Sequence, residues 1–152
     1  LSSAALTSWN TLLADSPRAA RIAGEAKAVL VFPEITKVGL GIGGEGGNGI
    51  LVKDDQVQGY YRTSSLSFGA QVGAQTYGYV VMFLTDEALE KFLSRSGYEL
   101  GVDGSIAVFK AGVTAEADTT NLKVDTVAFV FEETGLMANW TVEGTRIKPF
   151  EF

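Results

Sequence analysis

Apolar residues recur at helical spacing at the start of the chain. The first set comprises Leu6, Trp9 and Leu13, and the second comprises Ala19, Ile22, Ala23, Ala26 and Leu30. Residues three or four positions apart share one face of a helix, so each set predicts a short amphipathic helix. Ser16 and Pro17 form a typical helix start between them, because serine caps the first turn and proline fits the first helical position. We therefore expect a helical region over about residues 3–28.

Strand-like runs begin at residue 29 and continue to the end of the chain. They cover residues 29–32, 38–45, 49–53, 57–63, 79–84, 105–110, 126–131 and 140–147. Pro33 should end the first run, since proline interrupts a strand ladder. Asp54, Asp55 and Gln56 favour a hairpin turn. Residues 79–84 are all apolar, which predicts a central strand that is buried on both faces.

One more helix is predicted between the strands. Thr85 is its expected N-cap, and the carboxylates of Asp86 and Glu87 suit the positive end of a helix. Its apolar stripe comprises Leu89, Phe92 and Leu93. Gly97 is typical of the residue that follows a helix C-terminus.

This order of elements predicts an α+β fold. Short N-terminal helices precede a strongly twisted, mainly antiparallel sheet that could close toward a barrel, with one inserted helix. No internal repeat or low-complexity linker divides the chain. We expect a single domain over residues 1–152, with its helical region over about 3–28 and its β-rich body over about 29–152.

Composition excludes several classes of function. The formal net charge is −6, and no run of basic residues exists, so neither nucleic-acid binding nor a polybasic membrane patch is indicated. The chain has no cysteine and no histidine, which removes disulfides, thiolate and imidazole catalysis and the commonest metal ligands. We therefore predict no catalytic residues, no metal site and no cofactor. The longest apolar run, residues 79–84, is far shorter than the roughly 20 residues of a membrane-spanning helix.

The glycine-rich segment at residues 39–44 formally matches the G-x-G-x-x-G fingerprint of dinucleotide-binding proteins. That fingerprint needs a helix directly after it, whereas another strand is predicted here. A turn or bulge is the preferred interpretation, and an anion-binding nest of backbone N–H groups is the alternative. The carboxylate pairs Asp54–Asp55 and Glu132–Glu133 lie beside turn residues and are read as solvated.

Two features suggest a contact surface. A dense aromatic stretch comprises Tyr60, Tyr61, Phe68, Tyr77, Tyr79 and Phe83. Most of it should be core, although aromatic residues beside glycine can also line a groove. The first 37 residues contain four basic and three acidic residues, a net charge of +1, while the remainder carries −7. The N-terminal helices are therefore the part of the chain least repelled by an anionic membrane.

Four stretches, taken together and in order, resemble the SYLF domain family. They are AKAVLVFPEITKVG at 26–39, SSLSFGAQVGAQ at 64–75, VMFLTDEALEKF at 81–92 and GLMANWTVEG at 135–144. The resemblance implies a non-enzymatic, lipid-binding module. Eukaryotic members resemble phosphoinositide-binding, actin-associated proteins whose membrane binding is attributed to a basic amphipathic N-terminal helix. The matching segment here, residues 17–28, is alanine-rich and only weakly basic.

The chain is more similar to bacterial members of the family, which resemble exported proteins and often lipoproteins. The resemblance therefore implies a periplasmic or outer-membrane-associated protein whose signal segment has been removed. The leading hypothesis is phospholipid binding at an envelope membrane. Its candidate lipid-binding residues are Arg18, Arg21, Lys27, Lys37, Tyr60 and Tyr61. The alternatives are a scaffold domain that binds another envelope protein and, ranked last, a hydrolase or transferase.

Overall fold

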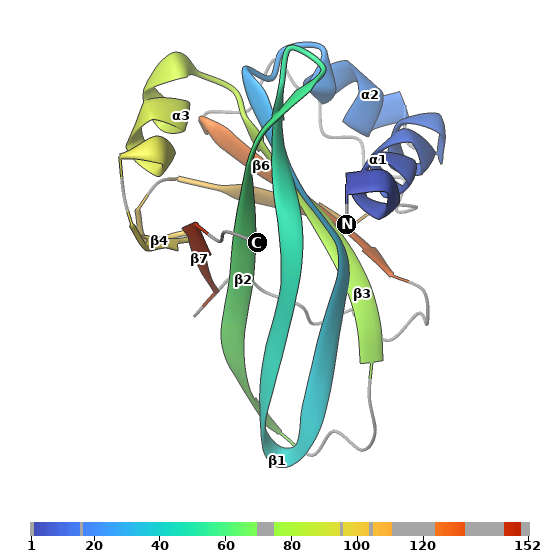
Figure 1. Cartoon of the computed structure of the whole chain (residues 1–152), viewed down its shortest axis with the longest axis vertical. Helices are drawn as coiled ribbons and strands as arrows, with labels where there is room; N and C mark the ends of the chain where they lie inside the picture. The colour runs from blue at the N-terminus through green and yellow to red at the C-terminus, as the bar shows by residue number, and fades with distance from the viewer. Residues whose placement is uncertain are drawn as a thin grey trace.

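The computed structural model describes residues 2–15, 17–69, 75–94, 96–103, 105–110, 124–132 and 145–149. Their elements are α1 Ser2–Asp15, α2 Pro17–Ala23, β1 Ala28–Lys53, β2 Gln56–Gly69, β3 Gln75–Phe83, α3 Asp86–Leu93, β4 Tyr98–Glu99, β5 Ala107–Lys110, β6 Thr126–Glu132 and β7 Arg146–Pro149. The strands form one strongly curled sheet in the order β4-β7-β2-β1-β3-β6-β5. The predicted α+β class and strongly twisted sheet are confirmed (Figure 1).

The long strand β1 organises the sheet. It descends, reverses at the far end of the sheet and returns (Figure 1). Its first half pairs with β3, from Ala28 opposite Phe83 to Lys37 opposite Gln75, and its second half pairs with β2. Glycine makes the return possible: a Cβ atom at Gly49 would lie 2.3 Å from the carbonyl oxygen of Val31. The sheet curls where these two halves approach each other.

Two sequence features fall inside β1 with different outcomes. The predicted strand end at Pro33 is wrong, because β1 continues through it. The pairing with β3 instead shifts register between Phe32 and Ile35, and such a bulge accommodates a proline that cannot donate to the ladder. Residues 39–44 lie within β1, which continues to Lys53, so the helix that a dinucleotide fingerprint needs directly after it is missing.

The predicted hairpin turn after β1 is confirmed. Lys53 pairs with Gln56 across it, and Asp54 and Asp55 have φ values of 53° and 61°. Two consecutive left-handed residues are the mark of a type I′ turn, whose twist matches that of the strands it joins.

Strand residues alternate between two apolar cores on opposite faces of the sheet. The inner core, which α3 covers, includes Leu30, Phe32, Tyr79, Val81, Phe83, Leu89, Phe92, Tyr98 and Ile147. The outer core, which α1 and α2 cover, includes Ala5, Leu12, Ala19, Ile22, Val31, Ile50, Val80, Met82 and Phe129. The strand β3 contributes to both cores and lies between β1 and β6. The prediction of a central strand buried on both faces is therefore confirmed.

The N-terminal helices form as predicted but differ in detail. Ala5 and Leu12 of α1 are buried and the predicted Trp9 packs against the same core, whereas Leu6 is 39% exposed, so the buried face agrees only in part with the predicted one. The second helix ends at Ala23 instead of extending to residue 28. Gly24, a poor helix former, follows it and begins the turn into β1. The predicted cap Ser16 lies outside the described residues.

The inserted helix α3 begins as predicted. The Thr85 hydroxyl accepts a hydrogen bond from the backbone N–H of Ala88 at 3.0 Å. Ala88 is buried beside Leu89 and Phe92, and Leu93 is 52% exposed. The helix ends at Leu93 with Ser94 as its C-cap, so the expected end at Gly97 is wrong.

The remaining strands are partly as predicted. The strand β6 is confirmed, and β5 begins two residues later than expected and pairs parallel with β6. The short strand β4 was not predicted, because a strand of two residues has no readable alternation. Residues 140–144 of the last predicted strand lie outside the described part of the chain. Among the described residues at this end, β7 covers Arg146–Pro149. None of the described helices is long and apolar enough to cross a membrane.

Candidate functional site

The cationic residues predicted at the N-terminal region do not all lie together. Arg21 is exposed in the last turn of α2, and Lys27 is exposed just before β1. The Lys27 backbone N–H donates to the Phe83 carbonyl at 2.7 Å, which fixes this segment to the end of β3. Lys37 pairs with Gln75 far along β1, about 30 Å from Lys27 at the rise of a strand. The side chains of Arg18 and Lys37 are outside the described set.

Acidic residues share the end of the sheet that carries Lys27. Because Ala28 pairs with Phe83, the start of α3 with Asp86 and Glu87 lies near this end. The reversal of β1 brings the acidic hairpin turn at residues 54–55 to the same end. Exposed carboxylates therefore outnumber Arg21 and Lys27 at this end of the sheet, and their negative charge weakens the attraction of these two cations for an anion.

Tyr60 and Tyr61 lie on opposite faces of the sheet, because successive strand residues alternate. Tyr60 is half-buried against the outer core. The Tyr61 ring packs on Phe92 in the inner core, with ring centroids 4.9 Å apart. Burial raises the pKa of the Tyr61 hydroxyl. The two rings therefore do not form one aromatic surface, and lipid binding by either stays a prediction.

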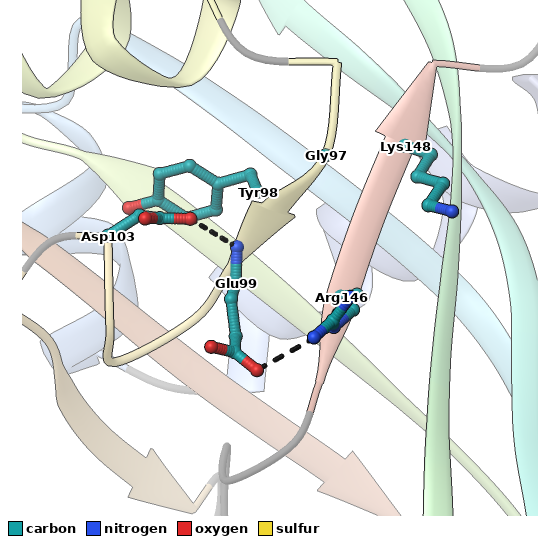
Figure 2. Close-up of a pocket in the computed structure, with 6 residues that line it drawn as sticks. All are labelled: Gly97, Tyr98, Glu99, Asp103, Arg146 and Lys148. Atoms are coloured by element: carbon teal, nitrogen blue, oxygen red, sulfur yellow. Dashed lines mark hydrogen bonds and ion pairs between the residues drawn. The ribbon is translucent and has the colours of Figure 1, made fainter.

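A pocket that sequence reasoning missed lies over the paired strands β4 and β7, beside the turn that follows β4. It has a volume of about 220 Å³ and is lined by Gly97, Tyr98, Glu99, Asp103, Arg146 and Lys148 (Figure 2). The Glu99 backbone N–H donates to the Asp103 carboxylate at 2.8 Å. The Glu99 side chain lies 3.7 Å from the guanidinium of Arg146, whose side chain is 65% exposed. One carboxylate is thus occupied by the backbone, and the other is only loosely paired.

Strand pairing extends the cationic lining of this pocket onto β2. Arg62 on β2 lies opposite Lys148, and Ser64 lies opposite Arg146, so their side chains share the outer face. The Arg62 guanidinium donates to the Asn48 side chain at 3.1 Å, which orients it along this face. We call Arg62, Arg146 and Lys148 the basic strip. All three are exposed.

The basic strip has no local signal in the sequence. Arg62 and Arg146 are more than 80 residues apart, and their proximity depends on the pairing of β2 with β7. The chemistry available there is recognition of an anion by charge and hydrogen bonds. No group of three or more His, Cys, Asp or Glu residues that could hold a metal ion occurs among the residues that the structure describes.

A protein-family model matches the second half of the chain. The model of the family Ysc84, described as Las17-binding protein actin regulator, matches residues 64–150, which is more than half of the chain. No curated protein sequence matches the chain significantly. The matched range includes α3, the pocket and the basic-strip residues Arg146 and Lys148, and it excludes α1 and α2.

Proposed function

The chain belongs to the Ysc84 family, the SYLF domain family that it resembles, and from this premise we propose that it binds phospholipid at a bacterial envelope membrane without catalysing a reaction. Membership supports an interaction domain that binds lipids or actin-related proteins. The family is a binding and scaffold family, not a known enzyme family. The choice of phospholipid as ligand is our proposal.

One observation carries the proposal: among the described residues, the Lys and Arg side chains are on the surface and the interior is almost entirely apolar. Every Lys and Arg whose side chain the structure describes is exposed, namely Arg21, Lys27, Lys53, Arg62, Lys91, Arg146 and Lys148. The buried polar side chains of the described residues are three threonines, Thr63, Thr126 and Thr145. This distribution supports binding at the protein surface, where exposed cations can reach lipid headgroups.

The net charge of −6 limits how such binding can work. At physiological ionic strength, charges more than about 8 Å apart are largely screened from each other. A local group of cations can therefore attract anionic headgroups although the whole molecule is acidic. Binding of this kind should weaken as salt is added.

Co-sedimentation with vesicles tests the proposal. We would compare phosphatidylcholine vesicles with vesicles that also contain phosphatidylglycerol, each at low and at physiological salt. We expect the protein to pellet with the anionic vesicles and to pellet less at the higher salt. Folded protein that stays in the supernatant with both vesicle types would reject phospholipid binding.

We also propose the cell envelope as the compartment, on the periplasmic side and associated with the outer membrane. The support is the similarity of the chain to exported bacterial members of its family. Fractionation of cells that express the natural gene, followed by immunodetection, tests this proposal. Recovery in the cytoplasmic fraction alone would reject it.

A second function, protein binding, is favoured by the family description, which names Las17 binding and regulation of actin. In a bacterial envelope the partner would be another envelope protein. Cross-linking in envelope extracts should then recover one discrete complex that contains this protein, and the protein should not bind vesicles. Vesicle binding without any such complex would favour the lipid proposal instead.

A further inference from the structure

We propose that the pocket over the paired strands β4 and β7 receives the phosphate of a membrane phospholipid headgroup, while Val102, in the turn that borders the pocket, enters the interfacial layer of the membrane. This inference rests on the proposed function and adds the surface that performs it. The principal contact with the membrane is then made by the basic strip and the turn at residues 99–103, and not by the N-terminal helices.

The charges around the pocket favour an anion. Arg62, Arg146 and Lys148 bring three positive charges to adjacent positions on neighbouring strands. Against them stand two carboxylates, of which Asp103 already accepts the backbone N–H of Glu99. At 3.7 Å and with an exposed guanidinium, the contact between Arg146 and Glu99 is weak enough for a phosphate to compete with it. Arginine binds phosphate well because its planar donors can engage two oxygens at once.

The size of the pocket favours a headgroup over a larger ligand. Pockets that enclose drug-sized ligands have volumes of about 300–1,000 Å³, whereas this one has about 220 Å³. A phosphate and its immediate substituents fit that space, and acyl chains do not. The lipid would therefore keep its chains in the bilayer and offer only its headgroup to the protein.

The turn that borders the pocket favours a lipid over a soluble phosphate as the ligand. Val102 is 70% exposed, more than any other large apolar side chain among the described residues. It lies in a tight turn in which the N–H groups of Val102 and Asp103 donate to the Glu99 carbonyl at 3.3 and 3.0 Å. Gly101 has a φ of 80°, which suits the glycine at that position. A fixed turn thus presents an aliphatic side chain beside exposed cations, a combination typical of interfacial membrane binding.

The contrast with the N-terminal surface supports the same choice. There, Arg21 and Lys27 share one end of the sheet with the acidic turn at residues 54–55 and with Asp86 and Glu87. Each surface has three described cations, because exposed Lys53 adjoins the acidic turn, but the basic strip has fewer competing carboxylates and an exposed aliphatic side chain next to it. These differences favour the pocket over the N-terminal surface as the site that contacts an anionic membrane.

Two double charge reversals test the choice, because each changes the net charge by the same amount. Arg146→Glu/Lys148→Glu alters the pocket, and Lys53→Glu/Lys91→Glu is its matched control at two exposed lysines of β1 and α3 that are not among the candidate lipid-binding residues. With vesicles of phosphatidylcholine and phosphatidylglycerol at low salt, we expect the pocket variant to bind at least about tenfold more weakly than wild type. The control should bind within about threefold of wild type, since bulk charge alone then acts.

Two milder comparisons guard against misfolding. Arg146→Gln/Lys148→Gln removes the charges without reversing them and should also weaken vesicle binding. Val102→Asp should weaken it, whereas Val57→Asp, at a 38% exposed position of β2, should not. Far-ultraviolet circular dichroism and the thermal unfolding midpoint of each variant establish that it folds.

A titration with inorganic phosphate, followed by backbone amide shifts in NMR spectra, locates the anion directly. We expect the largest shifts at residues 97–103 and 146–148. Wild-type vesicle binding that survives in both pocket variants would overturn this inference and leave the proposed function standing. Wild type that ignores vesicles would overturn both, and phosphate shifts in that protein would indicate a soluble ligand instead.

Discussion

The inner and outer faces of the curled sheet are built differently. On the inner face, aromatic rings pack closely: the ring centroids of Phe83 and Phe92 are 4.9 Å apart, and Tyr98 meets Phe92 edge-on at 5.2 Å. The outer face is mainly aliphatic where α1 and α2 cover it. Beyond those helices, the same face carries exposed Arg62, Arg146 and Lys148.

This difference separates stability from binding. Burial of large aromatic side chains gives the greatest free energy per residue, so the inner face should determine whether the chain folds. The uncovered part of the outer face contributes little burial and is available to a partner. Substitutions inside should therefore lower stability without changing the affinity of the folded protein, and substitutions of the exposed cations should do the reverse.

The largest stability effect is expected at the centre of the inner core. Phe92→Ala removes a fully buried ring that contacts Tyr61, Phe83 and Tyr98, and should lower the free energy of unfolding by about 3–5 kcal/mol. The neighbouring variant Leu93→Ala, at a 52% exposed position, should change it by less than about 0.5 kcal/mol. Urea unfolding measures both. Equal losses in the two variants would contradict the assignment of Phe92 to the core.

A smaller loss is expected where β1 returns on itself. Gly49→Ala places a Cβ atom 2.3 Å from the Val31 carbonyl and 2.5 Å from the Phe32 ring, so one half of β1 must move. We expect the free energy of unfolding to fall by about 1–3 kcal/mol.

The matched control for this substitution is Gly59→Ala on β2. Its Cβ atom would meet only the far end of the Tyr61 ring, at 3.4 Å. Alanine there should be neutral or should stabilise by up to about 1 kcal/mol, because glycine is unfavourable within a strand. Denaturation curves in which both alanine variants behave alike would show that the two halves of β1 do not approach each other as described.

Local sequence patterns were sufficient where local chemistry determines the structure. The hairpin turn at Asp54 and Asp55 follows from the tolerance of aspartate for left-handed geometry. The cap at Thr85 follows from the orphan N–H groups of a helix start. The central position of β3 follows from its continuous apolar run.

Tertiary context decided the features that were missed. Pro33 lies inside β1 because a register shift in the pairing with β3 accommodates it. The buried face of α1 depends on its contact with the outer core, so Ala5 is buried although Leu6 is more apolar. The pocket requires β7 to lie between β2 and β4, which brings Lys148 opposite Arg62. A pairing across more than 80 residues has no counterpart in a local pattern.

The smallest of these effects on stability is expected from pH, and it again depends on a residue of the inner face, Tyr61. Burial raises the pKa of Tyr61 above its ordinary value of 10.0, so the folded protein keeps this phenol protonated at pH values where the unfolded chain ionises. The resulting contribution to stability is complete below about pH 10 and is lost as the pH rises through the raised pKa of the folded state.

Tyr61→Phe removes an ionisable group without removing the ring. Urea unfolding at pH 8 and at pH 11 should therefore show that wild type loses more stability than the variant over this interval. A constant difference between the two proteins would place the Tyr61 hydroxyl in water instead of against Phe92.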